Sequence, residues 1–375
     1  MSTTAMLTGD NNAVKLWEME AWEQAMQQTV FGHAFNRGSI YYADELSGKD
    51  ARGDQLTFSY IGKLFNNPIG EGGTARGNEE ALDLSSHNMK MNVSRIPVSN
   101  PAAQTIEQQR THINFDEKTR KAISKRAAEL LDTSLFMQLA GSTPTSVTWN
   151  GTTYDSAAKK LHIQGHNTPV APSTNRILRA AAAATDQALT SADKFSLPLI
   201  DYALELNSRQ NQPMETLPGG TFDLYISPEQ MVDLQHDATS AIQWYNIELN
   251  RIAGGAANAI DSPFKNGMIC AGKYKNVYIY QAPRVAYGQN SSSSAVITTV
   301  RRAVLVGADA ASFASPFGGR PSDKSVPIKF FEELVDLGYY KSVEGRLLYG
   351  LKKMIPDNKE DIGVTVISTY AAAHT

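Results

Sequence analysis

Cysteine is nearly absent from this sequence. Among its 375 residues the only cysteine is Cys270, so no disulfide can form within the chain. A chain without disulfides is typical of proteins that fold in a reducing compartment such as the cytoplasm. Apolar residues surround this cysteine in the stretch NGMICAGKY, and no histidine motif accompanies it. We therefore expect a buried structural thiol and not a nucleophile.

Long apolar runs and strong charge of one sign are also missing. No window of about 18 apolar residues occurs, so we expect no membrane-spanning helix and no membrane partner. The N-terminal stretch MSTTAMLTGDNNAVKLWEME lacks a basic segment followed by an apolar one, which argues against a signal peptide. The formal net charge is −3, whereas a tight non-specific binder of nucleic acid needs a strong basic field. The hydrophobic content of 42% fits a folded chain of roughly two or three domains.

Recognisable catalytic and metal-binding patterns are lacking too. His162 and His166 have the spacing of a zinc motif, but the motif's glutamate is absent, a glycine interrupts the helix it needs, and no third ligand is suggested. The carboxylate pairs Glu79–Glu80 and Glu332–Glu333 are adjacent, so on a strand their side chains would point to opposite faces. We therefore expect a protein that is not an enzyme and that binds no cofactor and no metal.

One glycine cluster is the exception. Gly70–Ala75 reads GEGGTA and fits the G-x-G-x-x-G/A fingerprint of dinucleotide-binding turns, after a strand-like run. In such a site a helix follows the glycines, and an acid about 20 residues further on binds the ribose. Here Gly77 interrupts the following segment, and the residue at that distance is the basic Arg95. A cofactor-dependent enzyme that uses this loop is therefore kept as an alternative, and it is not the favoured one.

A long hairpin is predicted around these glycines. Leu56, Phe58 and Tyr60 alternate with polar residues, and so do the apolar residues of MKMNVSRIPV, residues 89–98. Between Asn66 and Asn88 no period is visible. A two-stranded ribbon is only marginally stable alone in water, so we expect something else to hold it, most simply a neighbouring chain.

A short amphipathic helix with two tryptophans is predicted before the hairpin. Apolar residues recur at helical spacing from Ala13 to Val30, and Trp17 and Trp22 belong to this segment. Two interpretations remain open. The helix packs on its own domain, or it is an arm that packs on a neighbouring subunit.

The strongest helix signal covers residues 116–139. Asn114 and Glu117 form a capping box at its start, and Gly141 is suited to end it. Apolar residues recur along one side, which is typical of a helix that lies across a sheet. The basic residues on the other side are interpreted as a solvated face. They are Lys118, Arg120, Lys121, Lys125 and Arg126.

The rest of the chain mixes helices and strands. A helix is predicted after Ser196, with Pro198 in its first turn, and a strand followed by a helix is predicted with Ser227 as N-cap and Pro228 next to it. Further strands are indicated by NVYIYQAPRV, SAVITTVRRAVLVGA and DIGVTVISTY, and a surface turn by GQNSSSSA. No β-α-β rhythm is visible, so the predicted fold class is α+β.

Several of these pieces, taken in order, resemble one known family. The chain is similar to the major capsid proteins of tailed bacteriophages, in the group typified by the coliphage N-four capsid protein. The chain departs from relatives at Ser227–Pro228, where they often have His-Pro, and in the inserted-looking run Ser291–Ser294. The pieces that carry the resemblance are GDQLTFSY, GNEEALDL, the helix 116–139, YISPEQMVDLQHD, SPFKNGMI, RRAVLVGADAAS, FFEELVDLGYYKSV, YGLKKM and DIGVTVIST.

The resemblance implies a capsid fold of the Hong Kong 97 type. This fold has an N-terminal arm, an extended β-hairpin loop, a peripheral domain built on a spine helix, and an axial domain. On this chain it implies an arm at 1–50, an extended loop at 51–100, a peripheral domain with the spine helix at 101–215, an axial domain at 216–325, and return strands of the peripheral domain at 326–375.

The resemblance also implies a structural function. It implies a major capsid protein that self-assembles as hexamers and pentamers into an icosahedral shell around double-stranded DNA, located in the virion and assembled in the host cytoplasm. Its partners would be copies of itself, with scaffolding, portal and decoration proteins as further candidates. A non-viral nanocompartment shell of the same fold is the nearer alternative. The candidate inter-subunit contact residues are Trp17, Trp22, Glu71, Arg76, Gly77, Asn78, Glu79 and Glu80.

Overall fold

The computed structural model places most of the chain. The helix predicted before Val30, with Trp17 and Trp22, lies outside the described residues except at its end, where a short helix α2 spans Val30–Asn36. The described residues are 29–43, 53–62, 64, 66–82, 84–101, 109–110, 115–143, 146–149, 152–155, 165–210, 212–236, 270–316, 328–336, 339–358 and 360–374.

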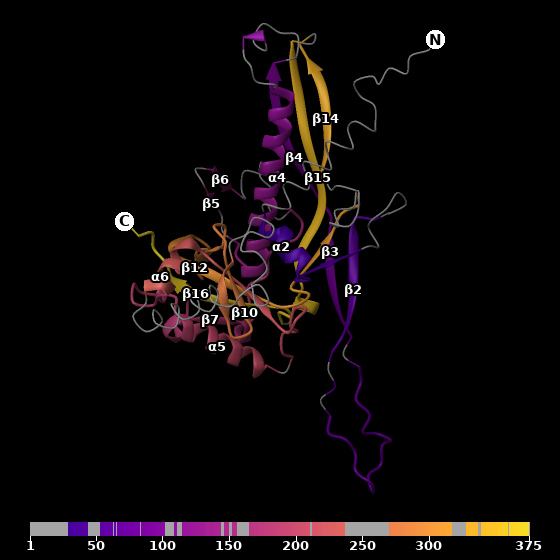
Figure 1. The fold of residues 1–375 in the computed structure, drawn as a ribbon. Coiled ribbons are helices and arrows are strands. Elements are labelled where there is room, and N and C mark those ends of the chain that lie inside the picture. The colour runs from indigo at the N-terminus through magenta and orange to yellow at the C-terminus, as the bar shows by residue number, and fades with distance from the viewer. Residues whose placement is uncertain are drawn as a thin grey trace.

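Two sheets and the helices packed on them form the fold, which confirms the predicted α+β class (Figure 1). The first sheet has five strands, and its long central strand β15 pairs with three others along its length. No helix among the described residues is long and apolar enough to cross a membrane. The strands of this first sheet are β1 (Ile40–Tyr42), β4 (Asn92–Pro101), β13 (Ala311–Ala314), β14 (Ile328–Val335) and β15 (Tyr340–Lys353).

The long helix α4 (Phe115–Ala140) lies along this sheet, which confirms the prediction for residues 116–139 (Figure 1). Its apolar side is buried, and Ile123 packs directly on Gly345 of β15. A Cβ on this glycine would lie 2.3 Å from Ile123 Cγ2, so only glycine permits this approach. The helix ends as predicted at Gly141, which has a φ of +58°, and the amide of Ser142 donates to the carbonyl of Met137.

The second sheet has seven strands in the order β7-β16-β12-β8-β10-β9, with β11 paired to β12. Alternate residues of its central strands bury opposite faces. One face, which includes Tyr225 and Val304, joins the core formed with α4, while the other, which includes Leu224 and Leu305, packs with α5 and α6. These elements are β7 (Ile177–Arg179), β8 (Phe222–Ile226), β9 (Cys270–Tyr274), β10 (Val277–Gln281), β11 (Tyr287–Gln289), β12 (Val296–Val306), β16 (Val364–Tyr370), α5 (Leu197–Ser208) and α6 (Pro228–His236).

The predicted N-cap residues of α5 and α6 lie at the starts of these helices. The Ser227 hydroxyl accepts from the amide of Gln230, and the Gln230 side chain accepts from the amide of Ser227, which completes a capping box at α6. Ser196 occupies the N-cap position of α5, although its side chain makes no capping hydrogen bond. Cys270 is buried, as expected of a structural thiol.

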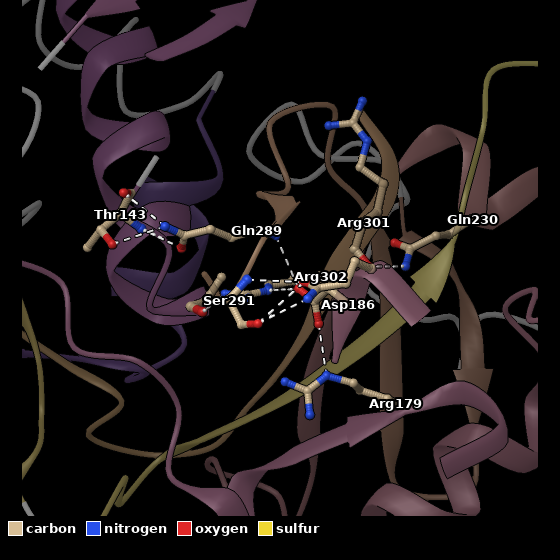
Figure 2. Close-up of polar contacts among 10 residues, drawn as sticks. Thr143, Arg179, Asp186, Gln230, Gln289, Ser291, Arg301 and Arg302 are labelled. Atoms are coloured by element: carbon tan, nitrogen blue, oxygen red, sulfur yellow. Dashed lines mark hydrogen bonds and ion pairs between the residues drawn. The ribbon is translucent and has the colours of Figure 1, made fainter. Parts of the chain in front are cut away.

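A buried carboxylate, Asp186, is bound by arginine side chains at the second sheet (Figure 2). Asp186, in the short 3-10 helix Asp186–Ala188, accepts from Arg302 Nε at 2.7 Å and from Arg179 Nε at 2.9 Å. Burial alone would raise the pKa of Asp186, but these two guanidinium groups hold it below its usual value. Arg302 also donates to the carbonyl of Ala140, at the end of α4, over 3.2 Å. The two parts of the core are therefore joined by hydrogen bonds of fixed geometry.

The prediction of one strand over residues 89–98 is wrong in one respect, because these residues are divided between two strands. β3 (Leu84–Lys90) ends before Met91, whose amide donates to the carbonyl of Asp54, and β4 begins after it. β3 pairs with β2 (Gln55–Ile61), whereas β4 belongs to the five-stranded sheet. The segment without visible period therefore already contains the first residues of β3.

The predicted domain boundaries stay a prediction. The sheets divide the chain differently in its last part, since β14 and β15 belong to the five-stranded sheet while β16 belongs to the seven-stranded one. The remaining described elements are short. They are β5 (Ser146–Trp149), β6 (Thr152–Asp155) and the 3-10 turns Thr174–Arg176, Ala180–Ala182 and Pro356–Asn358.

Candidate assembly surface

A two-stranded ribbon, made of β2 and β3, projects from the body and carries the loop between them (Figure 1). The strands are antiparallel, from Gln55 opposite Lys90 to Ile61 opposite Leu84. Buried and exposed residues alternate along β3 because one face of the ribbon lies on the body and the other faces solvent. A hairpin is therefore present, but its second strand is β3 at Leu84–Lys90 and not the predicted strand over residues 89–98.

The base of the ribbon is anchored by His87, which is buried. Its Nε2 lies 3.2 Å from the Ser312 hydroxyl, and its Nδ1 lies 3.4 Å from the amide nitrogen of Ile355. The ring of Phe58 stacks on the imidazole with centroids 6.0 Å apart. Burial, with a smaller effect from the charge of Lys352, lowers the pKa of His87 to about 4. The anchor is therefore a neutral imidazole at neutral pH.

Further contacts hold the base to the same chain. The Asp357 carboxylate accepts from both the amide and the hydroxyl of Ser86 at 3.0 Å, and Met89 is buried in a small apolar cluster with Ala43 and Ala314. The ribbon is thus a third layer on its own subunit. The ribbon is held by something else, as expected, but at its base this is the same chain and not the neighbouring chain that was the simplest candidate.

The glycines beyond the ribbon form turns. The amide of Gly73 donates to the carbonyl of Gly70 at 2.9 Å, and the amide of Asn78 donates to the carbonyl of Ala75 at 3.1 Å. Gly77 has a φ of +90°, a conformation that favours glycine. Among the described residues of this loop no helix follows the glycines, so the helix N-terminus that a dinucleotide phosphate requires is lacking there. The turn geometry therefore gives no support to the cofactor alternative.

Two of the predicted contact carboxylates shape the loop itself. Glu80 accepts from the amide of Asn66, 14 residues earlier, at 2.8 Å and so closes the loop. Glu79 accepts from the amide of Gly77 at 2.6 Å. Both acids thus have an internal partner, with Glu79 exposed and Glu80 half-buried, whereas Glu71 lies exposed in the first turn.

Four large apolar side chains are exposed where the ribbon becomes the loop, and we call them the loop neck. Ile61 and Leu84 face each other across the strands and are 60% and 67% exposed, while Leu64 and Leu82 are 55% and 58% exposed. Contiguous exposed apolar residues of this kind mark interaction surfaces. Sequence reasoning missed the neck, although apolar residues flanking a glycine-rich loop were a visible signal.

The structure brings six of the predicted contact residues into this one exposed loop. They are Glu71, Arg76, Gly77, Asn78, Glu79 and Glu80. Trp17 and Trp22 lie outside the described residues, so their part of the prediction stays a prediction. The loop and the neck together form the candidate assembly surface.

The described histidine and carboxylate side chains that were considered as metal ligands or catalytic groups do not form a common site. Within the described ranges no group of three or more His, Cys, Asp or Glu side chains could hold a metal ion. His166 is exposed, and His162 lies outside the described residues. Glu332 pairs with Lys341 at 2.9 Å while its neighbour Glu333 is exposed, so this carboxylate pair does not act on one point.

Comparisons with known proteins identify the family of the chain. A family model described as phage capsid protein matches residues 5–373. The chain belongs to the phage capsid protein family. No curated protein matches the sequence. The predicted recognition is therefore confirmed at family level, while the assignment to the coliphage N-four group stays a prediction.

Three solved structures show the same fold. The capsid of Ralstonia phage GP4 is 21% identical over 100% of both chains, with a TM-score of 0.74. The capsid asymmetric unit of cyanophage Pam1 is 18% identical over 89% of both chains, with a TM-score of 0.61. The head of Helicobacter pylori bacteriophage KHP40 is 11% identical, covers 98% of this chain and 93% of its own, and has a TM-score of 0.57. The expected capsid fold of the Hong Kong 97 type is confirmed.

The family match fixes the coarse function of this capsid protein. It is a structural protein that forms the shell of a phage, and its place is the virion.

Proposed function

We propose that copies of this capsid protein contact one another through the loop and the loop neck, and so assemble as hexamers and pentamers into an icosahedral shell around double-stranded DNA. The observation that carries the proposal is the exposed neck on a ribbon whose base is fixed to its own subunit. A fixed base with an exposed end favours contact with a second copy over a further contact within the chain.

The neck supplies favourable energy for such a contact. Full burial of one large aliphatic side chain contributes about 1.5–3 kcal/mol. Four partly exposed side chains would together contribute a few kcal/mol, before the cost of ordering is subtracted. One such contact is weak, but many identical contacts in a closed shell act together through avidity.

The proposal extends to catalysis and partners. We propose that the protein catalyses no reaction, that the shell is built in the host cytoplasm, and that scaffolding, portal and decoration proteins are its other candidate partners. The mild negative charge of −3 suits a shell that contains DNA without binding it tightly. The phage family match favours this function over a non-viral nanocompartment.

A loop replacement tests the contact. Residues 62–83 are replaced by Asn-Gly, a turn that joins two antiparallel strands directly and keeps Ile61 opposite Leu84. We expect a folded protein that forms no closed shells by electron microscopy, while the unaltered chain forms them. A matched control replaces the surface turn Ser291–Ser294 by the same dipeptide. Closed shells from the loop replacement would refute the proposal.

A further inference from the structure

Along residues 340–347 the strand β15 lies between two edge strands of its sheet, β4 on one side and β14 on the other (Figure 1). Within the part of the chain that the structure describes, neither edge pairs with a further strand. An edge strand leaves the N–H and C=O groups of every second residue without a strand partner, and these groups are a template for pairing with another chain.

The two edges differ in how well they are protected against such pairing. β4 contains Pro97 and Pro101, which have no N–H to donate, and a proline in an edge strand faces the open side. β14 reads IKFFEELV, with neither proline nor glycine, and its residues from Phe331 to Val335 are all exposed. β14 is therefore the edge that can accept a further strand.

We propose that β14 of one copy pairs antiparallel with β14 of a second copy, across a twofold axis at Phe331. This contact goes beyond the proposed function, because it involves neither the loop nor the loop neck. In a shell, both copies turn the same face of the sheet toward the interior. Because side chains alternate between the two faces, residues of equal parity must then lie opposite each other, so the axis passes through a residue and not between two.

The charges of β14 select the register. With the axis at Phe331, Lys329 of each copy lies opposite Glu333 of the other, and no other axis through a residue of β14 places this lysine opposite a carboxylate. An axis at Glu332 or Glu333 would place that carboxylate opposite its own copy, which is unfavourable. Lys329 also has an interaction within its own chain, so these cross-strand pairs fix the orientation of the two copies and contribute little affinity.

The same register brings apolar residues together. Phe331 is 45% exposed and lies opposite its own copy at the axis, while the Arg346 guanidinium of the same chain lies 4.2 Å from the centroid of its ring. Leu334 is 65% exposed and lies opposite Ile328 of the second copy. Apolar cross-strand pairs stabilise a sheet, so the pairing covers two exposed apolar side chains of each copy.

The position of α4 is compatible with this contact. The helix packs mainly on β15 and β4, and it reaches β14 through the long side chain of Arg120, which pairs with Glu332. Phe330 lies opposite Gly345 and so faces the helix, whereas the odd-numbered residues of β14 face the other side. Pairing at the β14 edge therefore does not force the α4 helices of the two copies together.

Cysteine cross-linking in assembled shells tests the register. At the axis the Cβ atoms of the two copies of residue 331 lie about 4.5–5.5 Å apart, close to the spacing of a disulfide. Under mild oxidation we expect Phe331→Cys to give at least tenfold more covalent dimer on a non-reducing gel than the unaltered chain. Glu333→Cys is the matched control, because its two copies would lie about 13 Å apart along the strands. The native Cys270 is buried and is present in both variants.

A charge exchange provides a second measurement without an added cysteine. Glu333→Lys places two lysines opposite each other on both sides of the axis. In light-scattering assays we expect this variant to need about threefold to tenfold more protein to assemble. Adding Lys329→Glu restores pairs of opposite charge, and we expect assembly to recover. Circular dichroism and melting curves verify that each variant is folded.

The outcomes separate this contact from the loop contact. Shells of Phe331→Cys without covalent dimers, or an equal yield of dimers from Glu333→Cys, overturn the pairing of β14. If Phe331→Cys forms no shells, the charge exchange decides. Unchanged assembly of Glu333→Lys, or a double variant that is no better than Glu333→Lys, then overturns the pairing. Shells from the loop replacement overturn the loop contact alone.

Discussion

The neutral His87 anchor predicts that acid loosens the ribbon. Nδ1 of the imidazole lies 3.3 Å from the carbonyl oxygen and 3.4 Å from the amide nitrogen of Ile355, and protonation places a charge in this buried site close to the cation of Lys352. The pKa is about 4 in the folded chain and about 6.5 in an unfolded one, because burial disfavours the charged form. The unfolded state therefore binds more protons between these values, and stability rises with pH across this window.

The size of the effect follows from the shift. A difference of about 2.5 pKa units corresponds to roughly 3 kcal/mol, present in full above pH 6.5 and lost as the pH falls toward 4. Part of this loss will appear as local opening of the ribbon, because β2 and β3 are attached mainly at this base. A change of this size would raise the open population by about a hundredfold.

A His87→Gln variant isolates this residue, because an amide keeps a donor and an acceptor but does not titrate. His33, whose pKa burial also lowers to about 4, is present in both proteins and so cancels in the comparison. Hydrogen exchange of the β2 and β3 amides, measured from pH 7 to pH 4.5 and corrected for intrinsic rates, is the assay. We expect acid to increase opening in the unaltered protein and much less in the variant. The same pH dependence in both proteins would refute the reasoning.

Three further predictions concern the core and the neck. Asp132 accepts from the amide of Phe31, and burial raises its pKa to about 7, so Asp132→Asn should gain stability relative to the unaltered chain as the pH rises from 4 to 7 in urea melts. Gly345→Ala should destabilise by about 1–3 kcal/mol, with partial rescue by Ile123→Ala, because the new Cβ would meet Ile123. Ile61→Ser with Leu84→Ser should leave melting unchanged but weaken assembly, measured by light scattering. A lower melting temperature there would contradict the assignment of the neck to contact between copies.

The sequence predicted the elements whose signals are local. The helix over residues 116–139 and its stop at Gly141 have a clear period and a terminating glycine, and both are confirmed. The predicted N-cap at Ser227 is equally local, since its hydroxyl accepts from the amide of Gln230, three residues away. Such features need no knowledge of the rest of the chain.

Long-range features could not be predicted in this way. His87 contacts Ser312 and Ile355, more than 200 residues away, and nothing in its own neighbourhood indicates burial. The break between β3 and β4 at Met91 is set by two different partner strands, and the residues on both sides alternate alike.

The structure suggests why the loop is ordered within the chain and yet exposed. Each residue that must be ordered when two copies bind lowers the affinity of the contact between them. The Glu80 carboxylate closes the loop through the amide of Asn66, and the Gly70–Gly73 turn shortens its free length. With the base fixed by His87, most of the ordering cost is met during folding of the subunit. If copies contact one another through the neck as proposed, this small apolar surface can then suffice for assembly, and contacts of this strength remain reversible, so that misplaced copies can leave a growing shell.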